Sequence, residues 1–133
     1  MMTLQTLLED PHITIAHDHA NDWLYVNWHG DQDFASVRQG GADILRLFRQ
    51  QRCHKVLNNN TLVTSMWSEA AEWAGKEWFP AMTAAGLQYF AWVYSPNLYS
   101  RLSTDLTLQF TVENPMVATF DDMETAQAWL KQL

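Results

Sequence analysis

The side chains best suited to binding chemistry follow the third predicted strand of the chain. Asn58, Asn59, Asn60 and Thr61 offer three amides and a hydroxyl, which can hold a small ligand by hydrogen bonds. The same residue types also build turns, because Asn tolerates left-handed backbone. Both interpretations predict a polar loop at the carboxyl end of a strand, the edge of an α/β sheet at which ligands and partners are usually bound.

Two serines and two tryptophans extend this candidate site into the next predicted helix. Ser68, or Ser65 one turn earlier, opens that helix, and a phosphate on either hydroxyl would be stabilised by the helix dipole. Capping the helix is the simpler role for Ser68. Trp67 and Trp73 are wide aromatic side chains, which line pockets, form subunit interfaces or seal the edges of a sheet.

Other reactive residues do not combine into a recognisable catalytic or metal-binding motif. Glu69 and Glu72 share a helix face, but no nucleophile or base accompanies them. His17 and His19 lie on one face of an extended chain and supply at most two metal ligands. Cys53 is the only cysteine, which we interpret as a packing residue. We therefore expect no metal and no cofactor.

Composition restricts the class of protein. A chain of 133 residues with 47% hydrophobic residues predicts one domain, spanning 1–133. Its net charge of −7 argues against binding to nucleic-acid phosphates. The amino-terminal residues do not resemble a signal peptide, and no apolar run is long enough for a membrane span, so we expect a cytoplasmic protein. Seven Trp at only 17% charged residues favour a homodimer that buries part of the aromatic set.

Hydrophobic periodicity predicts the elements that must position the candidate site. Strands are expected at 12–17, 23–28, 54–58, 88–94 and 116–120. Helices are expected at 34–51, at 68–85 with a division at Pro80, after Ser95-Pro96, and after Asp121-Asp122. The third helix has an alternative, because Leu106, Leu108, Phe110 and Val112 also fit the period of a strand.

This order, ββαβαβαβα, predicts an α/β fold. The first two strands are joined by a five-residue turn, so they should form an antiparallel hairpin. The later strands alternate with about four helices, which implies parallel pairing through right-handed crossovers. The expected architecture is a mixed, mostly parallel sheet with an N-terminal β-hairpin.

Several packing motifs resemble those of the SpoIIAA-like (STAS/SEC14-like) family. They are Trp28-His29-Gly30 at the end of the second strand, a Lys-Val-Leu third strand from Lys55, and a closing Phe120-Asp-Asp followed by Ala126 and Trp129-Leu130. Further stretches, around Trp67 and from Tyr89 to Pro96, are similar to a subgroup of small bacterial proteins of unknown role. The resemblance covers nearly the whole chain and implies a single SpoIIAA-like domain.

The resemblance also implies a function. Anti-sigma-factor antagonists of this class are phosphorylated near the start of the second helix, where this chain has Thr61, Thr64, Ser65 and Ser68 but lacks their Asp-Ser pattern. We expect a non-enzymatic regulatory or protein-interaction module. The alternative is a binding protein for a small apolar or amphipathic ligand, and an uncharacterised enzyme comes third. A deep pocket bounded by Asn59, Trp67, Trp73 and Tyr94 would favour the ligand.

Overall fold

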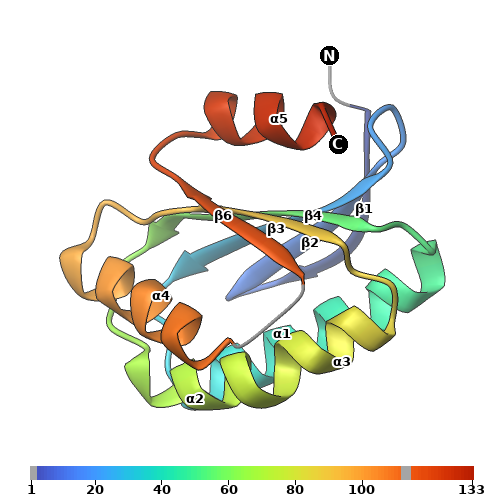
Figure 1. The fold of residues 1–133 in the computed structure, drawn as a ribbon. Coiled ribbons are helices and arrows are strands. Elements are labelled where there is room, and N and C mark those ends of the chain that lie inside the picture. Colours follow the sequence, from blue (N-terminus) through green and yellow to red (C-terminus); the bar gives the residue numbers. More distant parts are fainter. Residues whose placement is uncertain (1–2, 112–114) are drawn as a thin grey trace.

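A six-stranded mixed sheet forms the centre of the computed structural model, which describes residues 3–111 and 115–133 (Figure 1). Its strands lie side by side in chain order, antiparallel from the first to the third and parallel from the third to the sixth. They are β1 (Leu4–Asp10), β2 (Ile13–Asp18), β3 (Trp23–Gly30), β4 (Lys55–Val63), β5 (Tyr89–Val93) and β6 (Met116–Phe120). The predicted fold class and the antiparallel β2–β3 hairpin are confirmed.

The helices cover the two faces of the sheet unequally. Every parallel crossover steps in the same direction across the sheet, so right-handed connections place the crossover helices on one face. Figure 1 shows α1 to α4 on that side, here called the α1–α4 face, and α5 alone on the other, the α5 face. The helical elements are α1 (Phe34–Gln51), η1 (Ser68–Ala70), α2 (Ala71–Trp73), η2 (Ala74–Trp78), α3 (Phe79–Ala84), α4 (Leu98–Phe110) and α5 (Met123–Lys131).

Strand β1 is an addition to the predicted order. It pairs with β2 at the edge of the sheet, with an irregular register between Thr6 and Leu8. Most of its side chains are exposed or half-buried. An edge strand needs no strict apolar alternation, which explains why its sequence carries a weak strand signal.

Strand β4 extends five residues beyond its predicted end. Asn58, Asn59 and Asn60 are strand residues with 3%, 6% and 4% of their surfaces exposed, and Thr61 continues the strand. The prediction of a polar loop at 58–61 was therefore wrong. Asn is unfavourable in an average strand, but here tertiary hydrogen bonds satisfy the buried amides and outweigh that preference.

The second and third helices begin differently from the prediction. Ser68 is the first residue of η1, whose N-cap is Trp67 and which has no side-chain capping bond, so the capping role of Ser68 was wrong. Asn97, rather than Ser95, caps α4 by accepting from the Ser100 amide. Residues 98–110 are helical, which excludes the strand alternative for Leu106, Leu108 and Phe110; Val112 lies outside the described residues.

Proline and glycine shape the wall of helices on the α1–α4 face. Pro80 has no amide hydrogen to donate, and a π-helical turn precedes it, in which the Phe79 amide donates to the Ala74 carbonyl. Gly40 lets α1 approach the sheet, because a Cβ there would overlap the ring of Trp28. A Cβ on Gly41 would lie 2.9 Å from Cη2 of Trp73. These two glycines therefore let α1 pack closely against the sheet and against Trp73.

Candidate functional site

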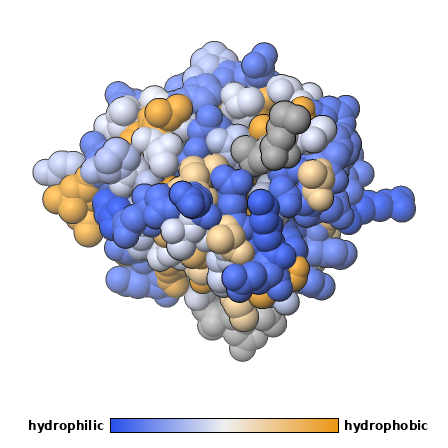
Figure 2. Space-filling model, turned by 90° about the horizontal axis from the view of Figure 1, so that it is seen from above, coloured by the Kyte–Doolittle hydropathy of each residue, from blue (hydrophilic) through white to orange (hydrophobic). Residues whose placement is uncertain are grey.

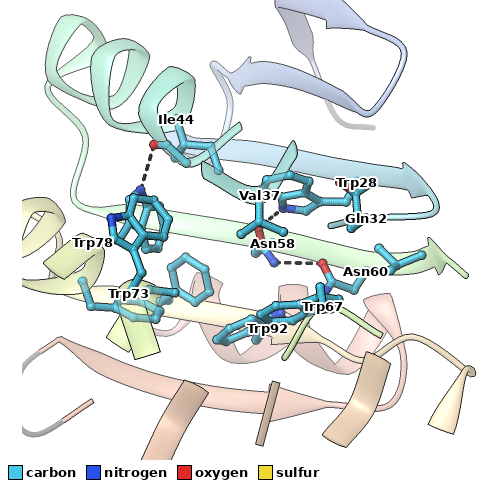
Figure 3. Close-up of a pocket in the computed structure, with 15 residues that line it drawn as sticks. Trp28, Gln32, Val37, Ile44, Asn58, Asn60, Trp67, Trp73, Trp78 and Trp92 are labelled. Atoms are coloured by element: carbon cyan, nitrogen blue, oxygen red, sulfur yellow. Dashed lines mark hydrogen bonds between the residues drawn. The ribbon is translucent and has the colours of Figure 1, made fainter. Parts of the chain in front are cut away.

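A largely buried cavity of about 50 Å³ lies between the sheet and the helices of the α1–α4 face (Figure 3). Its floor comes from β3, β4 and β5, and its roof from α1 and the segment running from α2 to α3. Seven of the lining residues are aromatic, and none is an Asp, Glu, Lys, Arg or His. The wall consists of Trp28, Gln32, Val37, Gly41, Ile44, Asn58, Asn60, Val63, Trp67, Trp73, Ala74, Trp78, Phe79, Phe90 and Trp92.

A short chain of hydrogen bonds crosses the floor of this cavity. The indole Nε1 of Trp28 donates to Oδ1 of Asn58 over 3.0 Å, and Nδ2 of Asn58 donates to Oδ1 of Asn60 over 3.2 Å (Figure 3). Residues 58 and 60 share a face because side chains alternate along a strand. All three residues are at least nine-tenths buried. We call this arrangement the amide relay.

Most other polar groups on the wall already have partners. The indole of Trp67 donates to Oγ of Ser100, and that of Trp78 donates to the Gly41 carbonyl. The side chain of Gln32 donates to two backbone carbonyls and accepts from Ser36. The exception is Trp92, which is 5% exposed and whose Nε1 has no hydrogen-bond partner within the described chain. A buried, unpaired indole N–H is costly, so a ligand that accepts from it would gain affinity.

Trp73 separates the cavity from a second, open hollow. Only Trp73 and Val37 of the lining residues are half-buried rather than buried, which places the opening between α1 and α2. On its other side Trp73 lines a surface hollow of about 330 Å³ together with Phe34, Glu69, Glu72, Lys76 and Glu77. The Arg38 guanidinium lies 5.6 Å from the centroid of the Trp73 ring. Outward rotation of this one indole would join the two spaces.

The structure brings half of the predicted site residues together. Asn58, Asn60, Trp67 and Trp73 line the cavity, whereas Asn59, Thr61, Ser65 and Ser68 do not. The pocket was expected to be bounded by Asn59, Trp67, Trp73 and Tyr94. This expectation was wrong for Asn59 and Tyr94, which do not line the cavity.

The remaining predicted site residues have structural contacts. Asn59 donates to the hydroxyl of Tyr25, and its Oδ1 accepts from the Thr61 amide. The Ser65 hydroxyl donates to the Gln32 carbonyl over 2.8 Å and accepts from the Gln32 amide over 2.7 Å, which fastens the loop after β4 to the start of α1. Phosphorylation of Ser65 or Ser68 stays a prediction, and on Ser65 it would break both of these bonds.

Sequence reasoning missed the aromatic strand residues of the wall. Trp28 and Trp92 were expected to pack in the sheet, and their polar nitrogens were not considered as part of a site. The signal that could have found them is strand register. Asn58 lies directly opposite Trp92 on β5, so an aromatic with an N–H group shares a face with the asparagines.

The histidines form a local cluster at the β2–β3 turn. Nδ1 of His17 lies 3.2 Å from Nδ1 of His19, and Nε2 of His17 lies 3.0 Å from Oδ1 of Asp22. In the part of the chain that the structure describes, no group of three or more His, Cys, Asp or Glu side chains is arranged to hold a metal ion. These contacts stabilise the turn.

The tryptophans are packed inward. Five of the seven are buried, and Trp73 and Trp129 are half-buried. The surplus that suggested a homodimer thus fills the two faces of the sheet, and the homodimer stays a prediction without that support. No helix within the described residues is long and apolar enough to span a membrane.

Cys53 is expected to be unreactive in the folded protein. It is 1% exposed, and burial, followed by the negative charge of Asp22, raises the pKa of its thiol to about 11. Since the thiolate is the reacting form, labelling by a disulfide reagent at pH 8 should be slower than in the unfolded chain by about 100-fold or more. Stopped-flow labelling with and without denaturant measures this ratio, and equal rates would contradict it.

The same thiol gives a pH dependence of stability. The unfolded thiol loses its proton near its ordinary pKa of 9.0, whereas the folded one keeps it until about 11. The contribution of the protonated Cys53 thiol to the free energy of unfolding is fully present below pH 9 and should be lost as the pH rises toward 11. Replacing Cys53 by Ala should remove this component of the pH profile.

The motifs behind the family resemblance are packing patterns rather than catalytic signatures, so they support a fold better than an activity. Neither a family model nor a curated protein sequence matches this chain.

Proposed function

We propose that this protein binds a small, predominantly apolar molecule in the tryptophan-lined cavity. The observation that carries the proposal is a buried, aromatic hollow lined by Trp92, whose buried Nε1 has no hydrogen-bond partner among the described residues. Ligand sites are typically concave and apolar, with a small number of polar groups that fix orientation. This agrees with the small-ligand alternative drawn from the sequence.

The chemistry of the wall favours binding over catalysis. None of the described lining residues is an acid, a base or a nucleophilic thiol, and the amides of the relay are not ionised at ordinary pH. What the wall offers is shape, aromatic surface and oriented amides. These are the properties of a receptor site.

The size of the cavity limits the size of the ligand, and a larger ligand would require the wall to move. An engineered cavity of about 150 Å³ is known to accommodate benzene, so the 50 Å³ present here takes only part of a ring. Trp73 is the half-buried wall residue with open space behind it. We expect ring-sized ligands to displace this indole toward the surface hollow.

Titration with small organic probes tests the proposal. Toluene and cyclopentanone, added to isotopically labelled protein, should shift the indole N–H signals of Trp28, Trp78 and Trp92 in a saturable manner. For ligands of six or seven heavy atoms, we expect dissociation constants of about 0.1–1 mM. Absence of saturable shifts for both probes up to their solubility limits would refute the proposal.

A substitution at the opening provides the matched control. Val37→Phe places a ring at the half-buried opening and should abolish probe binding while the protein stays folded. Leu45→Phe makes the same kind of enlargement at a half-buried position of the same helix that is not part of the wall, and should leave binding unchanged. Equal effects of both variants would show that the probes bind elsewhere.

A protein-interaction module is the second candidate function. In its favour, Met66, Leu98, Tyr99 and Leu102 are 53–63% exposed near the carboxyl ends of the parallel strands. The Trp67 amide donates to Oγ of Ser103, which holds the loop after β4 against α4. Figure 2 shows hydrophobic side chains projecting at the left edge, the side on which α4 and the loop before it lie in Figure 1.

The occupant to test on this surface is a second copy of the chain. Sedimentation equilibrium at micromolar concentration should show self-association of the wild type and a 15.4 kDa species for Leu98→Glu with Leu102→Glu. A wild type that stays monomeric at all concentrations would refute the homodimer.

A further inference from the structure

The amide relay has a fixed polarity, which determines what it presents to the cavity. An indole N–H can only donate, so the bond from Trp28 requires that Oδ1 of Asn58 be the acceptor. The other end of that amide, Nδ2 of Asn58, must then donate, and it faces Oδ1 of Asn60. The relay therefore leaves the Nδ2 group of Asn60 as its free end.

The free end of the relay is a second donor without a partner on the cavity wall. Asn60 is 4% exposed, and its Nδ2 donates to none of the described residues. Among the described residues, Nε1 of Trp23 and Nε1 of Trp92 are fully buried donors without a partner, and of these two residues only Trp92 lines the cavity. Asn60 and Trp92 both line the cavity and lie on the same face of neighbouring strands, Trp92 directly opposite Asn58 and Asn60 two residues further along β4.

From this polarity we infer that the natural ligand is a small neutral molecule whose hydrogen-bond acceptor, a carbonyl oxygen or a ring nitrogen, is held by Asn60 and Trp92. The inference rests on the proposed function and specifies its ligand. A ligand without an acceptor would leave both donors unpaired. A ligand with a donor at this position would bring two polar hydrogens of like partial charge together, which is repulsive.

The absence of charged side chains on the wall further restricts the chemical groups that the ligand can bury. Transfer of an ionised group into an apolar cavity is strongly unfavourable without a partner, and the described lining residues supply no charged partner. A carboxylate or an ammonium group would therefore remain outside, beyond Trp73. The buried part of the ligand is a neutral, flat, acceptor-bearing group that packs among aromatic rings.

An isosteric pair of probes tests this inference. Cyclopentanone and methylenecyclopentane have the same shape, but only the ketone has an acceptor. The ratio of their dissociation constants is measured in the wild type and in Trp92→Phe, and comparing the two ratios cancels the difference in hydration of the probes. We expect the preference for the ketone to fall by about tenfold in Trp92→Phe, because this variant cannot form one buried hydrogen bond to the ketone oxygen.

Two further variants make the test specific. Asn60→Leu should lower the ketone preference in the same way, because it removes the free end of the relay. Trp23→Phe is the matched control: it also removes a buried indole N–H without a partner, but one in the core on the α5 face, outside the cavity wall. It should reduce stability and leave the preference unchanged.

The outcomes separate this inference from the proposed function. Saturable binding of both probes with the same ratio in the wild type, Trp92→Phe and Asn60→Leu would overturn the acceptor inference and keep the cavity as a ligand site. An equal loss of preference in Trp23→Phe would also overturn it. Failure of both probes to bind the wild type would refute the proposed function itself.

Discussion

Replacing Asn58 by Leu is expected to lower the free energy of unfolding by about 2–4 kcal/mol, because the substitution removes the centre of the amide relay. Leu has the same branching as Asn and is larger, so the substitution leaves no cavity and its cost arises from the lost hydrogen bonds together with overpacking. Nε1 of Trp28 loses its acceptor and Oδ1 of Asn60 loses its donor, both in a region shielded from water. Urea denaturation of both proteins measures the difference.

The neighbouring residue provides a matched control on the opposite face of the same strand. Asn59 is also buried, but its amide contacts the hydroxyl of Tyr25 and the backbone N–H of Thr61, and both of these residues are half-buried. A hydroxyl near the surface can turn toward water, so Asn59→Leu should cost only about 0.5–1.5 kcal/mol. A larger loss for Asn59→Leu than for Asn58→Leu would contradict the central role of the relay. The indole N–H signal of Trp28 should move only in Asn58→Leu.

These asparagines also show how far the sequence could predict the site. The segment was singled out because its amides follow a strand, at the edge of the sheet where ligands are usually bound, but its predicted conformation was wrong. Propensity favours a turn for such a run, whereas the strand is selected by partners distant in sequence: Trp28, 30 residues away, and Tyr25, 34 residues away. No local pattern encodes contacts of this kind.

The fold itself was largely predictable because its signals are local and periodic. The stripe of α1, the buried run of β5 and the Asp33 cap follow directly from residue spacing, and Asp33 does accept from the Ser36 amide. The edge strand β1 was missed because half-exposed residues leave no alternation to read. The cavity was beyond prediction, since its wall combines side chains from three strands and the helices above them.

A second large effect is expected at Gly75, where the π-helical turn η2 meets α4. A Cβ at this position would lie 2.6 Å from Cβ of Phe110, 2.8 Å from the Thr107 carbonyl oxygen and 2.9 Å from the carbonyl carbon of Phe110. Two of these three are backbone atoms, which cannot rotate away as a side chain can. Gly75→Ala therefore forces the two helices apart.

The expected loss of stability is about 1–3 kcal/mol, the usual cost of overpacking, in spite of the better helix propensity of Ala. Glu77→Ala, an exposed substitution in the same turn, should change stability by less than about 0.5 kcal/mol. The two variants separate the steric effect from a general sensitivity of η2. A neutral or stabilising Gly75→Ala would show that α4 is free to shift.

The substitution at Gly75 should also affect the cavity, because the residues that form part of its roof directly precede Gly75 in the chain. Trp73 and Ala74 line the cavity, and Gly75 follows them against α4. Moving η2 away from α4 should displace Trp73 and weaken probe binding, in addition to the loss of stability. Titration of Gly75→Ala with cyclopentanone, at a temperature where the variant is fully folded, measures this coupling. Unchanged affinity in a destabilised variant would show that the cavity wall does not depend on the α4 contact.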